Sequence, residues 1–76
     1  MIREHERVVL TGPIKEYGLE TGDIGTVVFV HNGGIGYEVE FVTLDGSTSH
    51  VVEVGAEQVR PVGSQEIPHV RQLAQA

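Results

Sequence analysis

Apolar and charged positions alternate most clearly between residues 35 and 42, which read IGYEVEFV. Apolar side chains occupy every second position, and Glu38 and Glu40 lie between them. Because successive side chains of a β-strand point to opposite faces, this pattern predicts a strand with one buried face and one exposed face. Further short runs rich in β-branched residues, each bounded by turn signals, predict strands at residues 7–11, 23–31, 48–54 and 59–62.

The order and length of these elements predict an all-β domain. Residues 55–58, GAEQ, are too few for an α-helix but fit one 3₁₀ turn directly before the last strand. Five short strands without a long helix predict a small, five-stranded, partly open barrel in residues 1–62. Residues 63–76 are polar and weakly patterned, and we expect a tail that is either disordered or a short helix beginning after Pro68.

The second and third strands are expected to form a hairpin, because Asn32-Gly33 is a strong signal for a two-residue turn. Such a turn would set His31 opposite Gly34 and Phe29 opposite Gly36, where the aromatic ring would cover the bare glycine. Val27 and Phe29 would then lie on the outer face with the glutamates. A three-residue turn would instead place Val27 and Phe29 inside. In the preferred register, the residues expected in the core are Val28, Val30, Ile35, Tyr37, Val39 and Phe41, with Val8 or Val9 and Val52 against them.

The glycines of this region are expected to serve backbone shape. Gly25 lies in the second strand, where the absence of a side chain permits a bend or a close approach of two backbones. The GGIG sequence at residues 33–36 opens a strand rather than a helix, so it does not match a phosphate-binding loop.

Charge and composition restrict the classes of partner. The chain has 76 residues, eleven acidic against five basic side chains, a formal net charge of −6 and no cysteine. The five cations are scattered, which argues against binding to nucleic acid and to anionic membranes and permits a basic protein partner. The sequence contains no apolar run long enough to span a membrane and no export signal, so we expect a cytoplasmic protein.

The segments VVLT, GLETGDIGTVV, YEVEFVTLDGSTSHVV and EQVRPV, which span residues 8–62, resemble a family of short uncharacterised bacterial proteins with an SH3-like barrel. Parts of the pattern are also similar to the barrel of the metal-free β subunit of nitrile hydratase and to the glycine-containing core of ribosomal barrels. The first resemblance implies the SH3-like fold and a small partner protein, antitoxin-like or immunity-like. The ribosomal comparison conflicts with the acidic charge of this chain.

The sequence gives little support for a catalytic or metal-binding site. The four histidines lack the close spacing of metal ligands, so we expect no metal and no cofactor. Ser47, Ser49 and His50 are near in sequence, but neighbouring strand residues point to opposite faces and no oxyanion motif surrounds them. Glu38 and Glu40 share a face about 7 Å apart by strand geometry, but an open strand face offers them no pocket. The sequence therefore does not predict an enzyme.

Protein binding is the remaining function. Tyr17 is the one large amphipathic side chain of the first loop, and Phe29 is expected to lie outside among acidic side chains. The candidate partner-binding residues are Tyr17, Val27, Phe29, Glu38 and Glu40. We expect a non-enzymatic interaction module that binds another protein or a second copy of itself. The alternatives are an accessory or maturation subunit of a metalloenzyme such as nitrile hydratase and, less favoured, a nucleic-acid-binding barrel.

Overall fold

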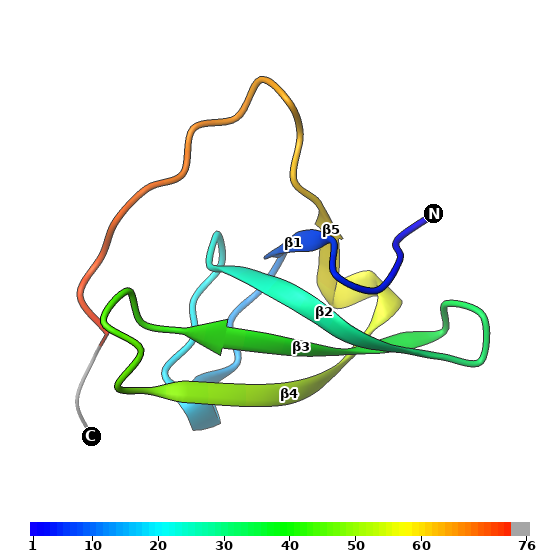
Figure 1. Ribbon diagram of the computed structural model, residues 1–76, viewed down its shortest axis with the longest axis horizontal. Helices are drawn as coiled ribbons and strands as arrows, with labels where there is room; N and C mark the ends of the chain where they lie inside the picture. Colours follow the sequence, from blue (N-terminus) through cyan, green and yellow to red (C-terminus); the bar gives the residue numbers. More distant parts are fainter. Residues whose placement is uncertain (74–76) are drawn as a thin grey trace.

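The computed structural model describes residues 1–73 and forms one antiparallel sheet of five strands (Figure 1). Neighbouring strands follow the order β4-β3-β2-β1-β5. In the described chain β4 and β5 are the two ends of this order, so the sheet curves without closing. This arrangement confirms the predicted all-β, SH3-like, partly open barrel. The elements are β1 (Arg7–Leu10), η1 (Lys15–Tyr17), β2 (Ile24–His31), β3 (Gly36–Val42), β4 (Ser49–Gly55), η2 (Ala56–Gln58) and β5 (Val59–Pro61).

The strands begin and end within one residue of the predicted positions, because turn residues interrupt each β-branched run. The predicted 3₁₀ turn is η2, where the Gly55 N–H donates to Gln58 Oε1 at 2.7 Å. The other 3₁₀ turn, η1, lies between β1 and β2 and was not predicted. It ends at Gly18, which has a φ of 69°, and it lies within a loop that the pair Ile14 and Leu19 closes.

The core contains side chains from all five strands and from the loop around η1. Val39 is fully buried and Phe41 is 5% exposed, as predicted. Val8, Val9, Tyr37 and Val52 are buried as well. The remaining buried apolar residues are Ile2, Leu10, Ile14, Leu19, Val27, Val54 and Val59.

The pairing of β2 with β3 differs from both predicted registers. His31 pairs with Gly36, and Phe29 pairs with Glu38, so Phe29 lies on the outer face but does not cover Gly36. The register then shifts between Val27 and Phe29, which leaves Val28 as the extra residue of a β-bulge. Because the bulge exchanges the two faces of the strand, Val27 pairs with Val39 inside and is fully buried. The predictions that Val27 lies outside and Val28 inside were therefore wrong, and Val28 is 38% exposed.

The connection between β2 and β3 contains four residues instead of two. Asn32 and Gly33 have the positive φ angles expected of this sequence, but Gly34 also has a positive φ, of 113°. The His31 carbonyl accepts hydrogen bonds from the N–H groups of Gly34, at 2.8 Å, and of Ile35, at 3.2 Å. A third permissive residue thus lengthens the turn, and Ile35, predicted in the core, is 68% exposed.

Gly25 marks a close approach of β2 to β3. A Cβ atom at this position would lie 2.5 Å from Val39 Cγ1, 2.8 Å from Phe41 Cε1 and 2.9 Å from the Glu40 carbonyl oxygen. These distances are below van der Waals contact, so the position requires glycine for packing. The structure supports the prediction that Gly25 serves shape.

The segment after β5 forms an extended arch that runs from β5 to the end of β3 near the β3–β4 turn (Figure 1). Residues 69–73 form no helix, and the rest of the predicted terminal helix lies outside the described residues. Residues 68–73 line a groove with the chain before β2 and after β3. Val70 is 77% exposed and Phe29 47% exposed, so the tail does not cover Phe29.

No helix within residues 1–73 is long and apolar enough to cross a bilayer.

Candidate protein-binding face

The outward-pointing side chains of β2, β3 and β4 form one continuous surface, which we call the outer face. Alternation along each strand places it opposite the core. Cross-strand pairing sets Glu38 between Phe29 and Glu53, and Glu40 beside Val51. The outer face consists of Thr26, Phe29, His31, Glu38, Glu40, Val42, Ser49, Val51 and Glu53.

Phe29 and His31 contact each other on the outer face, where His31 also contacts two glutamates. Their ring centroids are 4.8 Å apart with an interplanar angle of 67°, an edge-to-face contact. His31 Nε2 lies 3.0 Å from Glu38 Oε2 and 4.0 Å from Glu53 Oε2. The imidazole is therefore held by carboxylates of two neighbouring strands, and it holds one side of the Phe29 ring in place.

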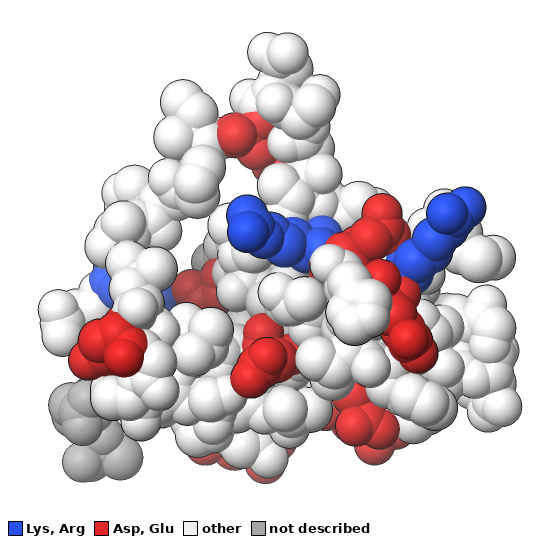
Figure 2. Space-filling model, viewed as in Figure 1, with Lys and Arg blue, Asp and Glu red and all other residues white. Residues whose placement is uncertain are grey.

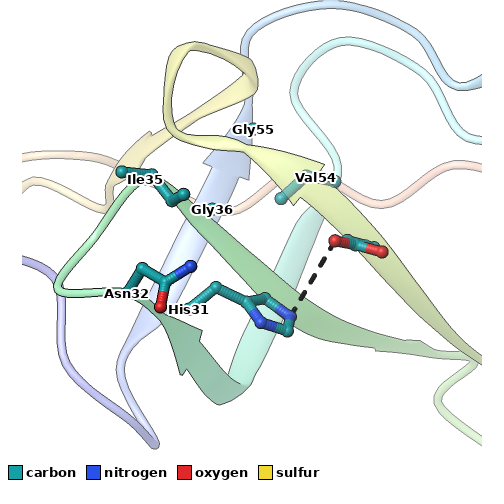
Figure 3. A pocket seen from close by; sticks show the side chains of 7 residues that line it. His31, Asn32, Ile35, Gly36, Val54 and Gly55 are labelled. Atoms are coloured by element: carbon teal, nitrogen blue, oxygen red, sulfur yellow. Dashed lines mark ion pairs between the residues drawn. The ribbon is translucent and has the colours of Figure 1, made fainter.

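Figure 3 shows this corner from close by, with the dashed line joining His31 to the carboxylate of Glu53. The side chains surround a shallow hollow of about 250 Å³ beside the β2–β3 turn. Asn32 and Ile35 of the turn and Val54 of β4 contribute the other walls. The hollow adds a concave corner to an otherwise flat strand surface.

Apolar and acidic side chains alternate on the outer face. Phe29, Val42 and Val51 are 47%, 57% and 53% exposed, and Glu38, Glu40 and Glu53 lie between them. The nine outer-face residues include no lysine or arginine, and Arg7 of β1, which pairs with Thr26, lies at the border of this face. Acidic side chains spread widely over the view of the molecule in Figure 2. An apolar surface of this kind with an acidic rim suits a partner with apolar and basic side chains.

The structure separates the candidates that the sequence grouped. Phe29, Glu38 and Glu40 share the outer face, but Val27 is buried and cannot reach a partner. Tyr17 contacts His50, with ring centroids 5.1 Å apart, and His50 points to the side of β4 opposite the outer face. Tyr17 therefore does not belong to this surface.

His31, Val51 and Glu53 were missed as members of the outer face. His31 could have been found, because it lies two residues after Phe29 on the same strand and residues two apart share a face. For Val51 and Glu53 the alternation of SHVVEV was available, but this strand carries valine on both faces, so the pattern did not identify the outer side.

The hydroxyl groups of Ser47 and Ser49 both bind neighbouring carboxylates. The Ser49 hydroxyl donates to Glu40 at 3.0 Å, and the Ser47 hydroxyl donates to Asp45 at 2.8 Å. Hydrogen bonds from the Ser47 N–H and from the Thr43 and Ser47 hydroxyls lower the pKa of Asp45. Within residues 1–73, histidines and carboxylates form no group of three or more that could hold a metal ion.

Comparison with known proteins gives a family but no assigned activity. Neither the curated proteins nor the solved structures include one that matches this chain. The model of a domain of unknown function, DUF4926, matches residues 4–61, which include all five strands and the outer face. The chain therefore belongs to the DUF4926 family.

Proposed function

We propose that the protein is a non-enzymatic module that binds another protein through its outer face. One observation carries this proposal: a half-exposed aromatic side chain, Phe29, lies among three glutamates on a surface to which β2, β3 and β4 contribute no lysine or arginine. Aromatic anchors ringed by polar side chains supply much of the binding energy in protein interfaces.

The anchor is ordered before binding. The edge-to-face contact with His31 restricts the Phe29 ring, and the Glu38 carboxylate in turn restricts His31. A side chain that is already held loses less conformational entropy when a partner covers it. The arrangement therefore supports binding with little rearrangement of the sheet.

Charge favours a partner with a basic surface. The net charge of −6 would steer such a partner, and Glu38, Glu40 and Glu53 would meet its cations. A symmetric dimer through this face would bring the same glutamates together, which opposes self-association there. The acidic balance also opposes binding to nucleic acid.

Within this proposal the partner is a bacterial toxin-like protein, as the sequence resemblance implies, and the chain acts as an antitoxin-like or immunity-like protein in the cytoplasm. The alternative is an accessory or maturation subunit of a metalloenzyme such as nitrile hydratase. The product of the adjacent gene, toxin-like or metalloenzyme-like, distinguishes the two roles.

The test is co-purification of the tagged chain with the product of the adjacent gene. Phe29→Ser should weaken the complex about 30-fold or more, the loss expected of an interface anchor. Ile67→Ser is the matched control, because Ile67 is 90% exposed but lies in the tail, and it should leave the affinity unchanged. A complex that survives both Phe29→Ser and the charge reversal Glu53→Lys would contradict the outer face as the binding surface.

A further inference from the structure

A groove larger than the hollow at His31 lies at the opposite end of the sheet. It has a volume of about 730 Å³ between three segments: residues 19–24 before and at the start of β2, residues 41–50 around the β3–β4 turn, and residues 68–73 of the tail. Its apolar lining includes Leu19, Ile24, Phe41, Val42 and Leu44. Only Val42 is shared with the outer face, so the groove is a second surface.

One tail residue, Arg71, enters a well-formed receptor beside this groove. Its guanidinium donates from Nε to Asp23 Oδ1 at 2.8 Å and from Nη2 to both Asp23 Oδ2 and the Gly18 carbonyl oxygen, the latter at 2.9 Å. Glu20 Oε2 lies 3.7 Å from Nη1. The forked contact with one carboxylate, completed by a backbone carbonyl, is specific for arginine, because lysine cannot donate along two parallel directions.

The receptor is held by the barrel itself. Asp23 Oδ2 also accepts the Glu20 N–H at 2.8 Å, and the Asp23 N–H donates to the Glu20 carbonyl at 3.0 Å. The Asp23 carbonyl accepts from Leu10 of β1 at 2.9 Å. Burial by itself would raise the pKa of Asp23, but the hydrogen bonds from Arg71 and Glu20 outweigh it and lower the pKa, so this carboxylate remains charged.

The rest of the tail is attached weakly. Arg60 pairs with Glu66 near the start of the arch, and from there to Arg71 the tail makes no hydrogen bond with the described residues. Ile67 and Val70 are 90% and 77% exposed. One arginine therefore holds the distal part of the tail in a site that the barrel keeps formed.

We propose that the Asp23 receptor and the adjoining groove are a docking site for an extended segment of a partner protein that carries an arginine flanked by apolar side chains, and that residues 68–73 of the chain, which form one wall of the groove, place Arg71 in the receptor as a competing stand-in. The charge of Asp23 and Glu20 matches the arginine, and the exposed side chains of Ile24 and Leu44 match its apolar neighbours. In the tail, Val70 and Leu73 flank Arg71 in the sequence. This inference does not depend on the outer face, since the two surfaces share only Val42 and have separate tests.

The test uses the full-length chain and labelled peptides. The first peptide has the sequence of residues 66–73, EIPHVRQL, and the second keeps only valine, arginine and leucine at the same positions within unrelated polar residues. The third is the first peptide with citrulline in place of arginine, which preserves shape but removes the charge. The Arg71→Ala chain should bind the first two peptides in a fluorescence-anisotropy titration and should fail to bind the citrulline peptide.

The wild-type chain should bind the arginine peptides at least tenfold more weakly than Arg71→Ala, because its own tail competes at an effective concentration of roughly millimolar. Adding Asp23→Asn to Arg71→Ala should abolish binding, and circular dichroism should verify that the double variant is folded. If it is not, the citrulline peptide still tests the arginine receptor. Equal binding of the citrulline peptide, or no binding to Arg71→Ala, would overturn the proposal.

Two further results would also reject docking of a partner protein. Binding of the first peptide without the second would show a latch specific to the chain's own tail. A wild-type dimer in light scattering that Arg71→Ala converts to a monomer would assign the groove to the tail of a second copy.

Discussion

Val27 lies directly opposite Val39 across the β2–β3 pair, and both side chains are fully buried. Two residues later on the same strand, Phe29 lies opposite Glu38 on the other face of the sheet. The bulge at Val28 makes both placements possible, because an even number of steps along a regular strand would keep the two residues on one face. The bulge thus exposes Phe29 while the strand still contributes a valine to the core.

This relationship gives a matched pair of variants. Val27→Ala should lower the free energy of unfolding by about 2–3 kcal/mol, because it removes buried methyl groups and leaves a cavity beside Val39. Val28→Ala should cost less than about 1 kcal/mol, because Val28 is partly exposed at the bulge. Urea unfolding of the two variants measures the difference, and equal costs would place the register shift elsewhere.

The two phenylalanines should differ in the same way. Phe41→Ala should cost about 3–5 kcal/mol, enough to unfold much of so small a domain. Phe29→Ser should cost only about 1 kcal/mol, because its ring is 47% exposed and packs mainly on His31. Thermal melts of both variants provide the comparison, and a loss of several kcal/mol for Phe29→Ser would show that its ring belongs to the core.

The elements of this fold could be predicted because each strand is a short β-branched run that ends at a glycine, an asparagine or an aspartate. The face on which each β2 side chain lies could not be predicted, because VVFV has apolar side chains on both faces of the strand. Any register would therefore bury some of them. The four-residue turn depends on the φ angle of Gly34, which Asn32-Gly33 does not determine.

The two candidate sites also differ in how far they could be predicted from the sequence. Alternation in β3 alone places Glu38 and Glu40 on the exposed face, so these two members of the outer face could be predicted. The arginine receptor joins Arg71 to Asp23, 48 residues apart in the chain, and no local pattern connects them. Contacts of that separation depend on the tertiary path of the tail.

Gly25 provides a test of close packing. Gly25→Ala should destabilise the fold by roughly 1–3 kcal/mol, because the added Cβ would meet Val39, Phe41 and the Glu40 backbone. Gly12→Ala is the control, since a Cβ there would meet no atom within 4 Å. Chemical denaturation should find Gly12→Ala close to wild type. If Gly25→Ala were as stable as the wild type, β2 and β3 would not approach each other as closely at Gly25 as the structure shows.

Glu66 gives the fold a predictable response to acid. The Arg60 guanidinium and the Gly63 N–H lower the pKa of its carboxyl group to about 2, from a usual value of 4.5. A carboxyl whose pKa is lower in the folded state stabilises that state above its usual pKa and loses the effect as the pH falls from about 4.5 to about 2. Stability of the wild type should therefore decline over this interval more than that of Glu66→Gln, which cannot ionise. The difference should be small, because the pair is exposed to solvent.

Side-chain carbon chemical shifts of Glu66, followed by NMR across the same range, should give a midpoint near 2 in the wild type. Arg60→Gln should move that midpoint upwards, and an ordinary midpoint in the wild type would show that the ion pair does not form in solution.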